Sequence, residues 1–264
     1  MAEPVYITFL WHMHQPYYKN LFSGEYLLPW VLLHGTKDYY DMPAMLKDFE
    51  GMKQNFNLVP SLLIQLADYE NMDARDTYIS IFMRDPQDFS ESDKIFILSN
   101  FFNANWDNMI RPYPRYYELL STRGFYYSKD NIGRIARYFS PDELRDIQVL
   151  FFLSWTDPMF FEVYEELRYL KAKGRLFTEA DKAILAGVLK DIIRNIVPMY
   201  KELSEKGIIE LSTSPFYHPI IPLVIDSRNA SESMPGGALP DRLFAHPEDA
   251  SHQIREAVRV FKDI

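Results

Sequence analysis

Two histidines that could do chemistry together stand near the start of the chain, separated by a single residue. His12 and His14 come at the end of residues 5–11, a continuous apolar and β-branched run with no alternation. Such a run is typical of a strand buried on both faces in a parallel sheet. Side chains two apart on a strand point to the same face, so both imidazoles would project together at the strand's C-terminal end. In α/β barrels the active site is built at that end of the strands.

The two imidazoles admit three kinds of chemistry, and the residues alone leave the choice open. Their ring nitrogens could be satisfied structurally by neighbouring strands. They could form a metal pair, because two imidazoles at this spacing suit zinc. They could also serve as hydrogen-bonding groups that hold a polar substrate.

Acidic residues that could join such a site are few and scattered. Asp157 lies at a helix break with Trp155 close by, and is a candidate for substrate contact. Glu210 lies within a strand-like run between two apolar residues, which favours a structural role, and Asp226 lies on the loop that follows. The chain is rich in aromatic residues, 16%, most of which would fill the core. Tyrosine and tryptophan also combine a flat apolar face with a polar tip, which suits sugars.

The elements that must position these residues follow a strand, helix, strand order at the start of the chain. Strands are predicted at residues 5–11, 56–59 and 208–213, with a helix near 41–55 between the first two, which is the βαβ signature. Residues 69–203 have a helical pattern almost throughout. The predicted fold class is therefore α/β with a long helical segment.

Capping residues and prolines within and after the helical segment indicate some of the helix boundaries. Ser140 followed by proline and, three residues on, Glu143 predicts a capped helix start. Pro198 should kink or interrupt the helix predicted over residues 181–203. A last helix should begin at His246-Pro247, and residues 231–240 form the clearest loop.

Several segments of the chain, in order, resemble one enzyme family. Residues 9–17, Phe-Leu-Trp-His-Met-His-Gln-Pro-Tyr, resemble the first signature of glycoside hydrolase family 57, whose core is His-Gln-Pro. Residues 209–220, Ile-Glu-Leu-Ser-Thr-Ser-Pro-Phe-Tyr-His-Pro-Ile, resemble its second signature. The segments that resemble its α-amylase and amylopullulanase-like branch are residues 28–31, 33–40, 56–62 and 243–250. A lone His-Gln-Pro would be weak evidence for the family, but several matching segments in this order are specific to it.

The resemblance implies an incomplete (β/α)7 barrel and a retaining mechanism. Such enzymes use a Glu nucleophile and an Asp acid/base that stand about 5–5.5 Å apart around the scissile bond. In the family these carboxylates lie in third and fourth signatures, the third containing a Trp-Pro pair that this sequence lacks. We therefore expect both catalytic residues beyond Ile264. Residues 1–264 would be the N-terminal part of the catalytic domain, a partial (β/α)7 barrel with a helical insertion at about 70–205, inactive alone.

The resemblance also implies a substrate and a set of binding residues. The substrate would be an α-1,4-linked glucan or maltooligosaccharide, with or without α-1,6 branches, and no metal or cofactor is implied. The residues expected to bind sugar hydroxyls are His12, His14, Gln15 and His218. Those expected to shape the site or stack beside the sugar are Trp11, Trp30 and Tyr17, and Asp157 is expected to touch the sugar.

Composition limits the other partners. The net charge of −9 does not give the positive field that drives non-specific nucleic-acid binding. No apolar run is long enough to span a membrane, and residues 1–4 lead into the first strand without a signal-peptide pattern, so we expect a cytoplasmic protein. The absence of cysteine fits a reducing compartment. The open edge of a partial barrel could mediate self-association.

Two other functions remain compatible with the residues. A metal-dependent hydrolase could use His12 and His14, with His218 and Asp226 as the further ligands that the sequence offers. Alternatively, the chain could be a non-enzymatic glucan-binding remnant.

Overall fold

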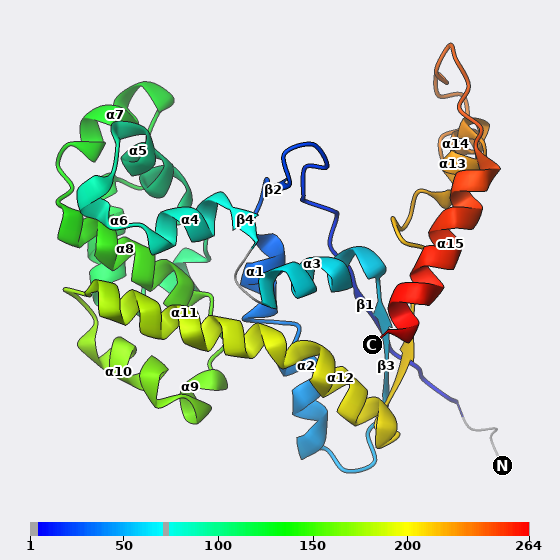
Figure 1. The fold of residues 1–264 in the computed structure, drawn as a ribbon, viewed down its shortest axis with the longest axis horizontal. Helices are drawn as coiled ribbons and strands as arrows, with labels where there is room; N and C mark the ends of the chain where they lie inside the picture. Colours follow the sequence, from blue (N-terminus) through cyan, green and yellow to red (C-terminus); the bar gives the residue numbers. More distant parts are fainter. Residues whose placement is uncertain (1–4, 71–73, 264) are drawn as a thin grey trace. The chain divides into compact units, whose positions relative to one another are not determined.

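The computed structural model describes residues 5–70 and 74–263 of the chain, so residues 1–4 and Ile264, on which two sequence expectations rest, lie outside the description. The chain divides into two compact units. The first contains the described parts of residues 1–18, 42–68 and 196–264, and the second those of residues 19–41 and 69–195. Figure 1 colours both along the sequence.

The first unit contains a parallel sheet of three strands. These are β1 (Leu10–Met13), β3 (Gln54–Leu58) and β5 (Ile209–Ser212), in the spatial order β1-β3-β5, and β1 and β3 are labelled side by side in Figure 1. The second and third strands form where the sequence predicted them. The first strand begins five residues later than predicted, although the carbonyl of Phe9 already accepts the backbone N–H of Asn55 at 3.2 Å.

The sheet of the first unit has one polar and one apolar face. His12 is registered opposite Asn57, and Asn57 opposite Ser212, so their side chains share a face. Phe56 lies on the other face, where it is buried and meets the ring of Tyr200 at 5.3 Å. This explains why the sheet forms: alternate residues of β3 supply the core and the remaining ones supply polar groups.

The prediction that the first strand is buried on both faces is wrong. Only Met13 is buried in β1, whereas Leu10 is 61% exposed and Trp11 44% exposed. The reason is position: β1 lies at an edge of the sheet and pairs only with β3 among the described strands.

The first unit also contains helices of short and medium length, which come before, between and after the three strands in the sequence. They are α2 (Asp41–Ala44), α3 (Pro60–Glu70), α12 (Ile196–Glu205), α13 (Ile221–Ile225), α14 (Ala230–Ser233) and α15 (Pro247–Lys262), with 3-10 turns η1 (Met45–Asp48) and η4 (Ser227–Asn229). The helix predicted near residues 41–55 stops at Asp48. Phe49 is extended and Gly51 takes a φ of +80°, so the chain turns there and enters β3 at Gln54.

The second unit is almost wholly helical, with one two-stranded parallel pair, β2 (Glu25–Tyr26) and β4 (Arg75–Asp76). Its helical segments are α1 (Trp30–Gly35), α4 (Thr77–Met83), η2 (Pro86–Asp88), α5 (Glu91–Asn100), the π-helix η3 (Trp106–Ile110), α6 (Pro114–Arg123), α7 (Lys129–Ala136), α8 (Pro141–Ser154), α9 (Phe160–Val163), α10 (Glu165–Lys173) and α11 (Glu179–Arg194). The predicted start at Ser140 is confirmed, because its hydroxyl and the Glu143 carboxylate form a reciprocal capping box at α8.

The predicted interruption near Pro198 is also confirmed. Helix α11 ends at Arg194, capped by Asn195, and α12 begins at Ile196. Pro198 therefore falls in the first turn of the new helix, where its missing N–H costs no intrahelical bond.

The architecture is helix-rich with small parallel sheets and is compatible with the α/β class.

Within residues 5–70 and 74–263, none of the helices combines the length and the apolar character needed to cross a membrane.

Candidate functional site

Three histidines from two segments of the chain meet in the first unit. His12 is on β1, His14 follows the end of that strand, and His218 lies in the loop after β5. The rings of His12 and His14 are stacked with centroids 5.5 Å apart, and the His218 ring meets them edge-on at 4.8 and 6.0 Å. We call these residues the histidine cluster. The predicted convergence of His12 and His14 is thus seen in the geometry, and His218 joins them.

A buried asparagine orients the first of these rings. Asn57, 6% exposed, accepts hydrogen bonds on its side-chain oxygen from the Ser214 hydroxyl at 2.9 Å and from Nδ1 of His12 at 2.8 Å. Its amide nitrogen donates to the hydroxyl of Ser212 at 3.1 Å. Because an amide oxygen only accepts, Nδ1 of His12 must be the donor, which places the proton of the neutral ring on Nδ1. Nε2 of His12 is then an acceptor.

The two other rings of the histidine cluster favour the neutral form. Desolvation by burial lowers the pKa of His14 below 6.5, and the charges of His12 and His218 lower it further, outweighing a hydrogen bond to the backbone of His218 that raises it. Desolvation also lowers the pKa of His218, again with a contribution from His12. A neutral imidazole has one N–H donor and one acceptor. Near neutral pH the cluster can therefore bind groups that both donate and accept.

The loop after His14 is tied to helix α3. Gln65, fully buried, donates to the carbonyls of Pro16 at 2.9 Å and Ser61 at 2.6 Å, and accepts the backbone N–H of Tyr18 at 2.8 Å. Gln15 accepts the Tyr18 hydroxyl on its side chain at 2.9 Å and the Ser61 hydroxyl on its carbonyl at 2.8 Å. These bonds fix the residues that follow the histidine cluster.

Two of the predicted aromatic residues of the first unit occupy different surroundings. Tyr17 meets the ring of Tyr217 edge-on, with centroids 5.9 Å apart, and Tyr217 directly precedes His218. Trp11 is adjacent to His12 on β1 and so points to the opposite face of the sheet. Its indole N–H donates to the Gln54 side chain at 3.0 Å. Tyr17 therefore contacts the loop that carries His218, whereas Trp11 lies on the other face of the sheet.

Trp30, a further predicted binding residue, belongs to the second unit. Its ring lies 6.1 Å from that of Trp155 and 6.1 Å from that of His34. His34 in turn meets Trp155 edge-on at 5.6 Å, and its Nδ1 lies 2.5 Å from a carboxylate oxygen of Asp38. Trp30 therefore belongs to a cluster of aromatic rings in the second unit that also includes the His34–Asp38 pair.

Asp157, the predicted acidic contact, also lies in the second unit. Its carboxylate accepts the backbone N–H of Met159 at 2.9 Å and lies 3.9 Å from the Lys37 ammonium, while its own N–H donates to the Thr36 carbonyl at 3.0 Å. These contacts stabilise the turn before α9, so the carboxylate has a structural role there.

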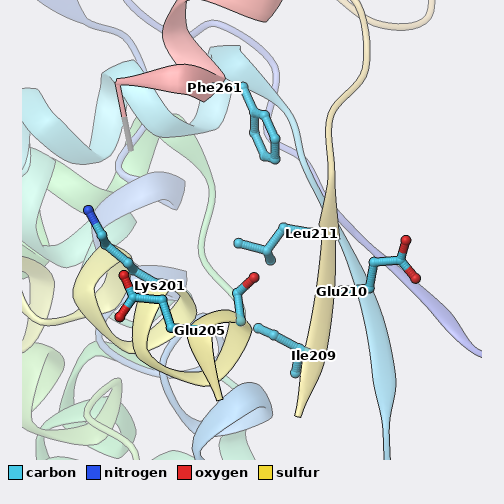
Figure 2. Close-up of a pocket in the computed structure, with 7 residues that line it drawn as sticks. Lys201, Glu205, Ile209, Glu210, Leu211 and Phe261 are labelled. Atoms are coloured by element: carbon cyan, nitrogen blue, oxygen red, sulfur yellow. The ribbon is translucent and has the colours of Figure 1, made fainter. Parts of the chain in front are cut away.

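The acidic residues near β5 do not form a facing pair. Glu210 points away from the hollow of about 490 Å³ into which Leu211 and Phe261 project, as Figure 2 shows. Asp226 is paired with Arg228, whose guanidinium lowers the pKa of that carboxyl to about 2. Over residues 5–70 and 74–263, no group of three or more His, Cys, Asp or Glu side chains is arranged to hold a metal ion.

Sequence reasoning missed several polar residues of this site. Asn57, Ser212 and Ser214 orient His12, and Tyr217 contacts Tyr17. A signal was present, because Asn57 is an amide in an otherwise apolar strand end, and a buried amide requires partners.

The comparisons with known proteins give one match. The chain matches the family model of glycosyl hydrolase family 57 over residues 8–264. No curated protein and no solved structure matches the chain.

Proposed function

This chain belongs to glycosyl hydrolase family 57, and from that membership we propose that it forms the sugar-binding part of a retaining glycosidase acting on α-glucans. The observation that carries the proposal is the histidine cluster, in which three imidazoles from two segments lie within 6.0 Å of one another. Sugar hydroxyls both donate and accept hydrogen bonds, and neutral imidazoles do the same. The proposed ligand is an α-1,4-linked glucan, with or without α-1,6 branches, of the kind that amylases and amylopullulanases use.

We also propose that β1, β3 and β5 are adjacent strands of a (β/α)7 barrel. In a barrel, inward-facing side chains alternate with outward-facing ones along each strand. The polar face that carries His12, Asn57 and Ser212 would then line the interior, and the apolar face that carries Phe56 would meet the outer helices. Residues of about 70–205 would be a helical insertion. Trp30, which precedes that insertion in the sequence, is proposed as a residue that stacks on sugar in the second unit.

We expect cleavage to need carboxylates besides those of the described residues. A retaining glycosidase places two carboxylates about 5–5.5 Å apart, one to attack the sugar and one to protonate the leaving oxygen. Asp226, with a pKa of about 2 beside Arg228, would be ionised at neutral pH and unable to donate a proton. Asp157 is engaged in a turn. We therefore propose that the 264-residue chain binds glucans weakly and does not hydrolyse them.

Binding of maltoheptaose to the purified chain, followed by calorimetry, tests the proposed site. His14→Ala should weaken binding about tenfold, the factor that corresponds to roughly 1.4 kcal/mol. His246→Ala is the matched control, because His246 is an exposed histidine of the same unit that is paired with Glu248. Equal affinity of the His14→Ala variant and the unsubstituted chain would contradict the assignment.

Hydrolysis is tested separately by incubating the chain with maltoheptaose and following reducing ends. We expect no sustained turnover. Turnover that is lost when Asp157, Glu210 or Asp226 is replaced by its amide would show that carboxylates of this chain perform the chemistry, and the account of the site would be wrong.

A further inference from the structure

The first unit contains a second cavity, and one of its lining residues is the sequence neighbour of His218. It has a volume of about 340 Å³ and lies among α3, the loop after β5 and helix α15. Ile64 and Val260 supply apolar surface to it, and Tyr217 lines it as well. Tyr217 immediately precedes His218, so the cavity and the cluster share one loop. Its size lies at the lower end of the range of small-molecule sites, roughly 300–1,000 Å³.

One wall of the cavity is a fixed pair of aromatic rings. Phe216 and Tyr217 meet edge-on with centroids 4.8 Å apart. Gln253 of α15, 8% exposed, fixes the backbone of both residues: its carbonyl accepts the N–H of Phe216 at 3.3 Å and its side chain accepts the N–H of Tyr217 at 3.2 Å. A rigid aromatic wall of this kind binds the apolar face of a flat or ring-shaped ligand at low entropic cost.

The lining contributed by α15 includes charged hydrogen-bonding groups. Arg259 donates from Nε at 3.0 Å and from Nη2 at 2.9 Å to the same oxygen of Glu256. That contact is the main cause that lowers the pKa of Glu256, so the carboxylate is ionised and acts only as an acceptor. Nη1 of Arg259 also donates to the Asp263 carboxylate at 3.5 Å. The second oxygen of Glu256 and the remaining N–H groups of Arg259 give the cavity lining both acceptors and donors.

We propose that this cavity binds one glucose unit of a glucan chain whose neighbouring units contact the histidine cluster. Aromatic rings together with donors and acceptors in one cavity match a sugar ring, which has apolar C–H faces and hydroxyls at its edge. Tyr217 also meets the ring of Tyr17, so the aromatic surface extends to the segment that follows His14. This inference rests on the proposed function, because it requires that the ligand be a glucan.

Filling the cavity tests the inference without touching the histidine cluster. Val260→Trp adds bulk from α15 into the cavity, and Arg259→Leu removes the donors from a side chain that is 61% exposed, where the fold does not depend on it. Val258→Trp is the matched control, because Val258 is on the same helix, 44% exposed, and does not line the cavity. Circular dichroism establishes that each variant is folded.

The affinity for maltoheptaose, measured by calorimetry, decides between the outcomes. We expect Val260→Trp and Arg259→Leu each to weaken binding about tenfold, which corresponds to roughly 1.4 kcal/mol, and Val258→Trp to leave it unchanged. If both cavity variants bind as the unsubstituted chain does while His14→Ala binds weakly, the inference is overturned and the proposed function stands. If neither the unsubstituted chain nor any variant binds, the proposed function fails and the inference fails with it. Should Val260→Trp not fold, Arg259→Leu decides alone.

Discussion

At the scale of single residues, Asn57 determines which nitrogen of His12 carries the proton. The amide is buried and engages three side chains, those of His12, Ser212 and Ser214. Each of these bonds fixes the orientation of the next, so the arrangement of His12 depends on a residue that need not touch a ligand. Buried polar groups of this kind stabilise a structure when all members are satisfied and cost free energy when one member is lost.

Replacing Asn57 should therefore destabilise the first unit. Asn57→Leu keeps the size of the side chain but leaves Ser212, Ser214 and Nδ1 of His12 without their partner. We expect the free energy of unfolding to fall by about 1–3 kcal/mol, measured by urea denaturation. Asn55→Leu is the control, since Asn55 is on the same strand and face and makes only a 3.4 Å bond to the Phe9 carbonyl with its side chain. Equal effects of the two substitutions would contradict the role given to Asn57.

The histidine cluster should make stability depend on pH. The pKa values of His14 and His218 in the folded chain lie below 6.5, the value of an unperturbed histidine. As pH falls below about 6.5, the unfolded chain takes up these protons first, so the free energy of unfolding decreases until the folded rings also titrate. Above that pH the two rings are neutral in both states and the destabilisation is absent.

Proton NMR titration of the imidazole rings gives the direct measurement. We expect the resonances that disappear in His14→Gln and His218→Gln to titrate with midpoints below 6.5. Urea denaturation between pH 7.5 and 5 should show a smaller loss of stability for His14→Gln than for His246→Gln, the exposed control. Midpoints at or above the unperturbed value would contradict the burial of these rings.

The sequence could predict which site residues lie together only where their spacing along one segment determines it. His12 and His14 were predictable because alternation along a strand is a local property. The roles of Asn57 and Ser214 were not, because their contact joins residues 157 positions apart and depends on how the strands are registered. Trp11 was assigned to the site by resemblance, whereas the pleat of β1 directs it to the opposite face.

At the scale of elements, starts and stops of helices are governed by a few local groups. Capping boxes begin α5, α8 and α11, and a glycine ends α10. Gly174 takes φ +67°, the left-handed conformation, and its N–H donates to the Leu170 carbonyl at 3.0 Å. Gly187, in the interior of α11, has no such requirement, and a Cβ there would meet nothing within 4 Å.

These two glycines should respond oppositely to the same substitution. Gly174→Ala should lower the free energy of unfolding by about 1–2 kcal/mol, because an alanine is strained in the left-handed region. Gly187→Ala should raise it by about 0.5–1 kcal/mol, because alanine loses less backbone entropy in a helix. Thermal and urea denaturation measure both. A destabilised Gly187→Ala variant would mean that the exposed surface of α11 is covered by something that the structure does not include.

Elements with local signals were predictable, and those whose limits depend on partners were not. The cap at Ser140 and the break before Pro198 form where the sequence placed them. The helix predicted near residues 41–55 was cut short because β3 begins at Gln54 in order to pair with both neighbours. The apolar run at residues 5–9 lies before β1, and its last residue, Phe9, accepts a backbone hydrogen bond from Asn55 of β3.

At the scale of the whole molecule, the first unit leaves apolar strand surface open. In the described part of the chain, β1 and β5 each pair only with β3, so each has one edge of unpaired backbone groups. Phe9 is 57% exposed and Leu10 61% exposed, and Ile7 before them is 76% exposed. Exposed apolar edge strands are templates for pairing with another chain.

We therefore expect the isolated 264-residue chain to associate with itself, and a charge on β1 to suppress this. Leu10→Lys places an ammonium group on the edge strand, where a lysine opposes pairing with a second edge. Leu27→Lys is the matched control: Leu27 is also an exposed leucine, 67% exposed, lies outside the strands, and gives the same change in net charge. Sedimentation velocity over a wide range of concentrations should show a monomer at every concentration for Leu10→Lys and a growing dimer fraction for Leu27→Lys and the unsubstituted chain. Association that both lysine variants abolish equally would point to charge rather than to the open strand, and a monomeric unsubstituted chain would show that the exposed edge is protected in solution.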